Sequence, residues 1–177
     1  TSMKTIGVFY GSSTGNTELA AEMICDQLGQ FVSHSADISK SEPTDLLAYD
    51  ILLLGVSTWN IGEMQDDWDD FLPRMEGLDL TGKQVGFFGM GDAIGYSYNF
   101  LDAMGMLWDA VKPLGSPQLV GVWPNEDYTF DESLAVYDDG HFVGVGLDED
   151  NEPELHEERI KGWLMKIMMD CELIPSA

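Results

Sequence analysis

Short hydrophobic runs alternate along this chain with segments in which apolar residues recur at helical spacing. The runs typical of β-strands cover residues 5–10, 51–56, 84–89 and 118–123, with a weaker one at 31–37. The segments typical of amphipathic helices cover residues 18–28, 66–75, 100–114 and 155–168. The run 51–56 is apolar throughout, which is expected of a strand covered on both faces.

This alternation predicts an α/β fold, a doubly wound five-stranded parallel sheet with helices on both faces. One stretch breaks the pattern, because residues 124–140 are polar and aromatic and residues 141–147 again read as strand. The simplest interpretation is a fifth strand interrupted by an insertion. Pro153 stands where the last helix can begin. We find neither an internal repeat nor a linker, so we expect a single domain over residues 1–177.

The segment 11–18 joins the first strand to the first helix through a loop rich in glycine and hydroxyl groups. A helix start carries unpaired N–H groups and the positive end of the dipole, so it can hold a phosphate. The candidate phosphate-binding residues are Ser12, Ser13, Thr14, Gly15, Asn16 and Thr17. Because this loop has no Lys and lacks dinucleotide spacing, a terminal monophosphate fits best. The alternative is an ordinary Ser/Thr-rich helix cap.

Charge and composition narrow the possible partners. The 177 residues are 44% hydrophobic, which indicates a folded globular chain. No apolar run approaches the ~20 residues needed to cross a bilayer. Asp and Glu number 32 against 8 Lys and Arg, giving a formal net charge of -24. This charge argues against nucleic acid and membrane surfaces as partners and favours proteins with a basic face, with solubility or life at high salt as the alternative explanation.

The first residues of the chain and its two cysteines bear on the cellular compartment. No basic segment followed by an apolar one opens this form, so we expect no secretory signal and a cytoplasmic location, or the plastid stroma for an algal source. Cys25 and Cys171 lack metal-ligand spacing and are expected to be free thiols, with a single bridge between them left open. The scattered His34, His141 and His156 favour structural or solvated histidines and no metal site.

Two further loops should meet the phosphate loop, because doubly wound sheets bind ligands beyond the carboxyl ends of their strands. Residues 57–64 and 90–99 each place a large aromatic, Trp59 or Tyr96, beside small residues. Exposed aromatics are costly unless they cover something flat. Either aromatic alone is better explained as core packing over a strand end. Both of them beside a monophosphate site favour flavin mononucleotide (FMN).

These segments resemble the flavodoxins over nearly the whole chain. The resemblance is carried by residues 12–18, 58–63, 91–96 with Asn99, and 146–151. The insertion resembles the one that defines the long-chain group. The resemblance implies a flavodoxin-like fold, one bound FMN, and a low-potential one-electron carrier, not an enzyme, that works between larger redox proteins. It further implies a monomer with basic-faced partners such as a ferredoxin/flavodoxin–NADP reductase and downstream acceptors.

The resemblance also implies roles for matching residues. Residues 12–17 would bind the phosphate with a further hydroxyl from Thr58, while Trp59 and Tyr96 would stack on opposite faces of the ring. Asp92 and the backbone near Gly91 would hold the pyrimidine edge, and the peptide between residues 60 and 61 would face flavin N5. The expected cofactor contacts outside the phosphate loop are Ser57, Thr58, Trp59, Asn60, Ile61, Gly62, Met90, Gly91, Asp92, Tyr96, Asn99 and Asp148.

Two residues depart from the family's pattern. Met90 stands where a hydroxyl residue is frequent, which leaves a backbone contact there, and Asn16 stands where Lys is also common. Carboxylates near the ring, such as those within 66–70 and Asp92, would disfavour added negative charge and lower the potential. We expect the insertion 124–140 to serve partner contact or stability more than FMN binding.

Other functions on the same topology remain as alternatives. The main one is an FMN-dependent NAD(P)H:quinone reductase, and a fragment of a larger diflavin enzyme is another. A phosphoacceptor receiver domain would need an Asp ending the third strand and a Lys ending the fifth. Here the third strand ends near Val56 and Ser57, and no Lys occurs between Lys112 and Lys161, so this alternative is disfavoured.

Overall fold

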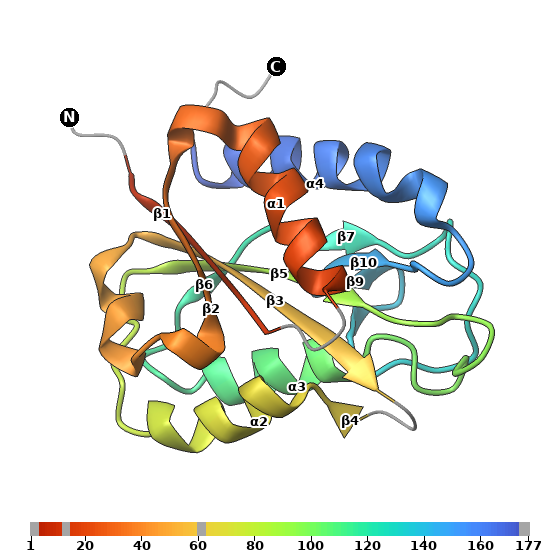
Figure 1. Cartoon of the computed structure of the whole chain (residues 1–177), viewed down its shortest axis with the longest axis horizontal. Helices are drawn as coiled ribbons and strands as arrows, with labels where there is room; N and C mark the ends of the chain where they lie inside the picture. The colour runs from red at the N-terminus through yellow and green to blue at the C-terminus, as the bar shows by residue number, and fades with distance from the viewer. Residues whose placement is uncertain (1–3, 12–14, 60–62, 174–177) are drawn as a thin grey trace.

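A parallel sheet of five strands runs through the middle of the computed structural model (Figure 1), which describes residues 4–11, 15–59 and 63–173. Its strands are β1 (Ile6–Tyr10), β2 (Val32–Asp37), β3 (Ile51–Trp59), β5 (Gln84–Met90) and β10 (Gly144–Leu147). They lie in the order β10-β5-β3-β1-β2 and pair in parallel. The chain changes winding direction between β1 and β3, which makes the sheet doubly wound. The predicted fold class is confirmed.

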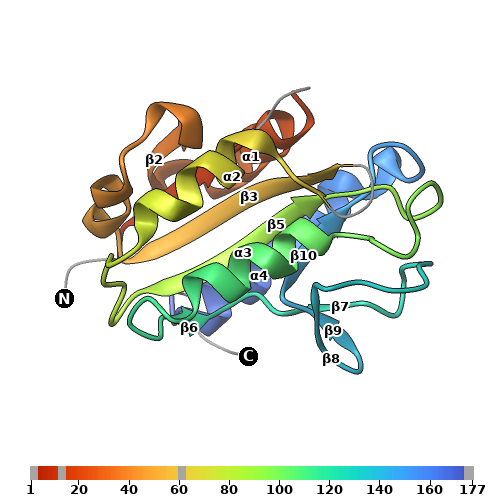
Figure 2. The same cartoon turned by 90° about the horizontal axis from the view of Figure 1, so that it is seen from below.

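Helices cover both faces of this sheet, as Figures 1 and 2 show. On one face lie α1 (Asn16–Leu28) and α4 (His156–Asp170), and on the other lie α2 (Asp66–Phe71) and α3 (Asp102–Val111). Short 3₁₀ helices cover Gly29–Phe31, Ile38–Lys40, Pro43–Ala48, Leu72–Met75 and Pro153–Leu155. An apolar core fills the space on each side of the sheet.

Strand β3 contributes to both cores. Leu52, Leu54 and Val56 pack on the side of α2 and α3, whereas Ile51 and Leu53 pack on the side of α1 and α4. All five side chains are fully buried. Burying each such side chain is worth about 1.5–3 kcal/mol. This two-sided burial explains the continuous apolar run 51–56.

The fifth strand is interrupted, as the sequence predicts. Its first part, β6 (Gln118–Leu119), pairs with Gln84 and Val85 at the start of β5, and its second part, β10, pairs with the end of the same strand. The insertion between them contains a separate antiparallel sheet in the order β7-β9-β8. Its strands are β7 (Trp123–Pro124), β8 (Val136–Asp138) and β9 (His141–Phe142).

The predicted strands 118–123 and 141–147 were wrong at their junctions, because each divides between the two sheets. Gly121 has a φ of 73°, a left-handed conformation that turns the chain out of the main sheet before Trp123. Its N–H donates to Asp170 Oδ2 at 2.9 Å, and its carbonyl accepts from Trp163 Nε1 at 2.9 Å. Hydrophobicity does not reveal this turn, since residues on both sides of it are apolar.

Other boundaries differ more modestly from those predicted. Strand β3 continues to Trp59, where it pairs with the short antiparallel strand β4 (Glu63–Met64), so part of the expected loop 57–64 is strand. Helix α1 begins at Asn16, ahead of the predicted start at 18, and α3 covers the inner part of 100–114. The helix predicted over 66–75 becomes 3₁₀ after Phe71, where Pro73 removes a backbone donor.

Two further sequence expectations concern cysteines and membranes. Cys25 is half-buried and Cys171 is buried, and both are free thiols, so the bridge left open by the sequence is not formed. Burial raises the pKa of the Cys171 thiol to about 11. Within the described residues, no helix has the length and apolar character to cross a membrane.

Candidate cofactor site

Strands β1, β3 and β5 all run toward the same edge of the sheet, on the right of Figure 1. This is the carboxyl edge, where doubly wound folds bind ligands. Several predicted contacts lie outside the described residues, namely Ser12, Ser13, Thr14, Asn60, Ile61 and Gly62. The backbone of Trp59 is described as the last residue of β3, but its side chain is not. Their roles stay predictions.

The first turn of α1 supplies the described part of the phosphate site. Gly15 precedes the helix with a φ of 92°, and a Cβ there would meet no described atom within 4 Å. Thr17 is fully buried, and its hydroxyl forms a short hydrogen bond with the hydroxyl of Ser57, which is itself buried. The helix start thus combines the N–H groups of a first helical turn with two neighbouring hydroxyls, which is a donor set suited to an oxyanion.

Thr58 links the end of β3 to the start of α3. Its hydroxyl oxygen accepts a hydrogen bond from the backbone N–H of Ala103 at 3.0 Å. The hydroxyl proton is still available as a donor, because a threonine hydroxyl both accepts and donates. This geometry is compatible with the predicted contact of Thr58 with the cofactor.

The loop after β5 is shaped around Asp92. Its Oδ1 accepts hydrogen bonds from the N–H groups of Ile94 at 3.1 Å and Gly95 at 2.7 Å, and from Asn151 Nδ2 at 2.8 Å. Burial raises the pKa of this carboxyl, but the three hydrogen bonds outweigh burial and leave its pKa below the ordinary value. A Cβ on Gly95 would lie 2.4 Å from Asp92 Oδ2, so a larger residue there would displace this carboxylate.

The remaining predicted residues of this loop differ in exposure. Tyr96 is 42% exposed, and its N–H donates to the Asp92 carbonyl at 3.0 Å. Met90 is 5% exposed and packs into the core beside α1 and α4. Gly91 N–H donates to the Leu147 carbonyl at 3.0 Å, and Asn99 Nδ2 donates to Asp102 Oδ2 at 3.0 Å. The loop therefore presents Tyr96 at the surface, and a backbone hydrogen bond at its start holds it to β10.

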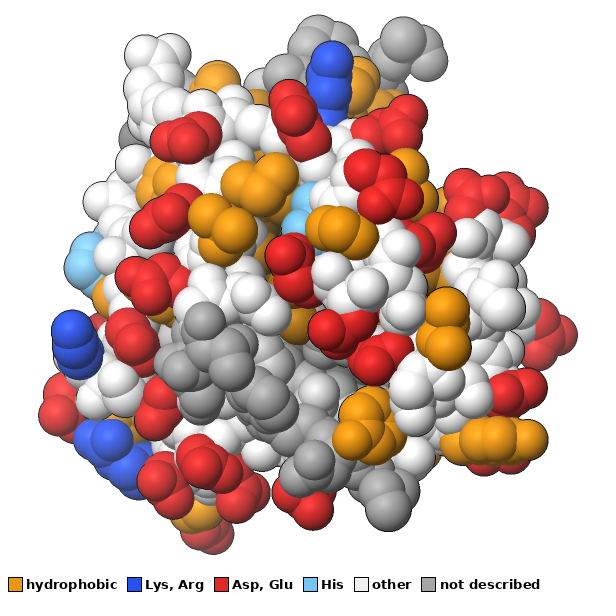
Figure 3. All heavy atoms as spheres, turned by 45° about the vertical axis from the view of Figure 1, so that its right-hand side comes forward, with side chains coloured by type: hydrophobic (Ala, Val, Ile, Leu, Met, Phe, Trp, Pro, Cys, Tyr) orange, Lys and Arg blue, Asp and Glu red, His pale blue; other side chains and the backbone are white. Residues whose placement is uncertain are grey.

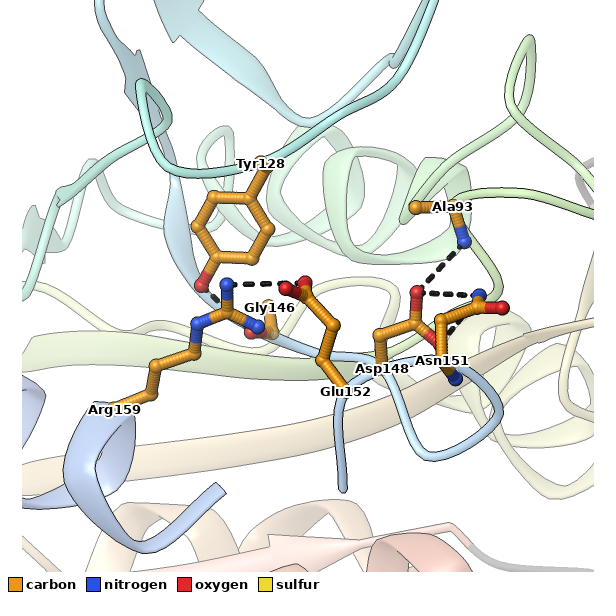
Figure 4. Close-up of polar contacts among 7 residues, drawn as sticks. All are labelled: Ala93, Tyr128, Gly146, Asp148, Asn151, Glu152 and Arg159. Carbon is orange, nitrogen blue, oxygen red and sulfur yellow. Dashed lines mark hydrogen bonds and ion pairs between the residues drawn. The ribbon is translucent and has the colours of Figure 1, made fainter. Parts of the chain in front are cut away.

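Asp148 directly follows β10 and is fully buried. Its Oδ2 accepts a hydrogen bond from the N–H of Ala93 at 3.0 Å, and both of its oxygens accept from Asn151 Nδ2, as Figure 4 shows. Sequence reasoning included Asp148 but missed Asn151, although the segment 146–151 that contains both was singled out. The signal was available in the spacing of an Asp and an Asn in one turn.

Negative charge accumulates around this edge. Figure 3 shows Asp and Glu side chains spread over this side of the molecule, with Lys and Arg near its margins. The carboxylates of Asp92, Asp148 and Asp150 have oxygens within 4.8 Å of one another. The pKa of Asp150 is raised by burial and by the neighbouring carboxylates of Asp92 and Asp148. By contrast, Lys83 donates to the Tyr49 carbonyl at 2.6 Å, beside the opposite ends of the strands.

The three histidines lie on separate parts of the described chain. His34 stacks on Tyr49 at 5.6 Å between ring centroids. His141 lies 2.8 Å from Asp138 Oδ1, and His156 lies 2.8 Å from Glu149 Oε2. Each has a structural partner of its own.

Comparison with known proteins agrees with this geometry. Residues 8–163 match the sequence model of the flavodoxin family. A flavodoxin of Klebsiella pneumoniae is 48% identical over 171 residues, covering 97% of each chain, and one of Synechocystis is 48% identical over 166 residues, covering 93% of this chain and 96% of that protein. The crystal structure of Fusobacterium nucleatum flavodoxin bound to FMN has a TM-score of 0.88 at 29% identity, covering 95% of this chain and 99% of that one. The chain therefore belongs to the flavodoxin family.

Proposed function

We propose that this protein binds one FMN and carries single electrons at low potential between redox proteins. The observation that carries the proposal is the carboxyl edge of the sheet, where the start of α1, the end of β3 and the Asp92–Tyr96 loop meet in a chain of the flavodoxin family. FMN is the ligand in the structure of the Fusobacterium nucleatum relative. An enzyme reading, an FMN-dependent quinone reductase, is not favoured, because the relatives matched over 97% of their length are flavodoxins.

The described residues fit FMN on both sides of the site. On the phosphate side, the helix start and the hydroxyls of Thr17 and Ser57 offer neutral donors to an anion. On the ring side, Tyr96 and Ile94 are 42% and 73% exposed, an apolar exposure that a flat ring would cover. The remaining contacts, including Trp59 and the peptide between residues 60 and 61, belong to the proposal.

The bound cofactor would supply the redox chemistry, and the chain would tune it. Tyr96, with Trp59, would exclude water from the ring. The carboxylate of Asp92, kept ionised by its hydrogen bonds, would disfavour extra negative charge beside it. The carbonyl between residues 60 and 61 would accept a hydrogen bond from N5. Each of these effects would favour a cofactor that takes up one electron at a time and donates it at a low potential.

A flavodoxin acts on redox partners, and the charge of this chain indicates what kind. We propose basic-faced proteins, such as a ferredoxin/flavodoxin–NADP reductase, that approach the acidic edge seen in Figure 3. We further propose a single-domain monomer. A cytoplasmic location is supported by the free thiols Cys25 and Cys171, which suit a reducing compartment.

The test is to identify the ligand and its stoichiometry. We expect the purified or reconstituted protein to be yellow, to release one FMN per chain in acid, as identified by mass, and not to oxidise NAD(P)H steadily on its own. Release of a dinucleotide, or no flavin uptake by the apo-protein, would contradict the proposal.

A further inference from the structure

The ring-side loop is attached to the turn after β10 by a buried carboxylate. Asp148 is fully buried, and its described hydrogen bonds come from Ala93 N–H at 3.0 Å, Asn151 N–H at 3.0 Å and Asn151 Nδ2 at 2.8 Å. A buried carboxylate is strongly destabilising unless donors surround it. Here those donors come from two loops that are separate in the sequence. The carboxylate of Asp148 therefore links the two loops through hydrogen bonds.

Asn151 joins a second carboxylate to the same assembly. Its Nδ2 donates to Asp92 Oδ1 at 2.8 Å as well as to Asp148. Asp92 Oδ1 in turn orders the turn that leads to Tyr96 by accepting from the N–H groups of Ile94 and Gly95. One amide group therefore connects the buried carboxylate of Asp148, a contact drawn in Figure 4, to the carboxylate of Asp92, which shapes the ring-side loop.

The insertion holds β10, the strand that directly precedes Asp148. Tyr128, from the insertion, donates its hydroxyl hydrogen bond to the Gly146 carbonyl at 2.7 Å, and the Arg159 guanidinium lies 4.1 Å from the centre of the Tyr128 ring. Arg159 also pairs with Glu152 at 3.2 Å, and the Glu152 N–H donates to the Asp148 carbonyl at 2.9 Å. Burial raises the pKa of Tyr128 to about 12, so its hydroxyl remains a donor at physiological pH.

We infer that Asp148 and Asn151 are positioning residues, which hold the loop 92–96 in place for the flavin ring while Tyr128 of the insertion holds the strand behind them. Asp148 acts through Ala93 and Asn151, a different role from the direct cofactor contact expected from the sequence. The insertion supports the cofactor site by holding β10 in place, in addition to any contact with partners. This inference rests on the proposed function and adds residues to it.

The first experiment compares two substitutions that remove the same charge. Asp148→Asn breaks the acceptor set for Ala93 and Asn151, whereas Asp150→Asn removes an exposed carboxylate of the same cluster. We expect Asp148→Asn and Asn151→Ala to weaken both FMN and riboflavin by the same factor, about 10-fold, which is the loss expected for one hydrogen bond to a charged group. Asp150→Asn should bind both ligands as tightly as the wild type, or more tightly.

Comparing the two ligands separates the ring side from the phosphate side. Thr17→Val, which removes a hydroxyl near the helix start, should weaken FMN and leave riboflavin nearly unchanged. A loss restricted to FMN in Asp148→Asn, or equal effects of Asp148→Asn and Asp150→Asn, would overturn the inference. Failure of the wild-type protein to bind either flavin would overturn the proposed function as well, and unchanged binding by the variants alone would overturn only the inference.

Hydrogen exchange in the apo-protein provides a readout without cofactor. In Asn151→Ala the amide of Ala93 should exchange about 10-fold faster, while that of Gly11, which donates to the Gly55 carbonyl at 3.1 Å, should not change. Equal acceleration at both amides would show general destabilisation and contradict a positioning role. The milder substitution Tyr128→Phe removes only the hydroxyl and should accelerate exchange at the same amide by a smaller factor. Tyr137→Phe, in the exposed part of the insertion, is its control.

Discussion

Tyr96 and Tyr98 lie two residues apart in one exposed loop, yet we propose different roles for them. Tyr96 is 42% exposed and its N–H is fixed by Asp92, whereas Tyr98 is 64% exposed and lines a hollow of about 560 Å³ against the insertion. Only the first lies in the turn that we propose to face the flavin ring. At the scale of single residues, function depends on which backbone turn carries the side chain.

Substituting these two tyrosines tests that difference. Tyr96→Ala should weaken both FMN and riboflavin by about 2- to 10-fold, the loss expected from one aromatic stacking contact. It should also raise the potential at which the second electron is added, because water then reaches the ring. Isothermal titration and a redox titration measure both effects. Tyr98→Ala is the matched control, and equal effects from the two substitutions would mean that Tyr96 does not cover the ring.

The carboxyl of Asp92 gives the apo-protein a pH-dependent contribution to stability. Its pKa is lowered from the ordinary value of 3.8, so its charged form is favoured in the folded state. The contribution is complete above about pH 4 and disappears as pH falls through the lowered pKa. We therefore expect the difference in unfolding free energy between wild type and Asp92→Asn to stay constant above about pH 4 and to shrink as pH falls below it, as measured by urea denaturation. A difference that grows on acidification would contradict the assigned hydrogen bonds.

At the scale of elements, the features that burial determines could be predicted from the sequence. The features that depend on the conformation of a single turn could not. The run 51–56 identified the central strand, because a strand covered on both faces must be apolar throughout. The division of 118–123 between two sheets was missed, because it depends on the left-handed Gly121. Asn151 was missed as well, because its role depends on Asp92, which lies 59 residues away.

The turn at Gly121 can be tested against another left-handed glycine. A Cβ on Gly121 would lie 2.5 Å from Ile167 Cδ1 and 2.6 Å from Trp163 Nε1, whereas one on Gly77, whose φ is 84°, would meet no described atom within 4 Å. Gly77→Ala should cost only the backbone strain of about 1–2 kcal/mol. Gly121→Ala should cost a further ~1–3 kcal/mol for overpacking. Denaturant unfolding decides this, and equal costs would show that α4 does not pack closely on the turn.

At the scale of the whole molecule, the net charge of -24 should speed the approach of basic partners. Asp66 and Asp69 are exposed in the first turn of α2, directly after β4, whereas Asp26 is exposed in the last turn of α1 and Glu76 is exposed after the 3₁₀ helix Leu72–Met75. Neutralising the first pair to Asn should slow electron transfer with a basic reductase at low salt. The double substitution Asp26→Asn with Glu76→Gln removes the same amount of charge and should slow electron transfer less.

The salt dependence of these rates provides the check. The Debye length falls to about 10 Å at 0.1 M salt, so the difference between the two double variants should shrink as salt rises. Stopped-flow rates across a salt series measure it. Equal slowing by both pairs would indicate that only the net charge matters, and rates independent of salt would indicate that the charge serves solubility.

The central claim is that this protein carries one electron at a time on a bound FMN. An anaerobic redox titration of the purified protein, followed by absorbance and electron paramagnetic resonance, tests it most directly. We expect two resolved one-electron steps, the second at the lower potential, with a radical signal that is largest between them. A single two-electron step without a radical signal would contradict the account and favour a two-electron reductase on the same fold.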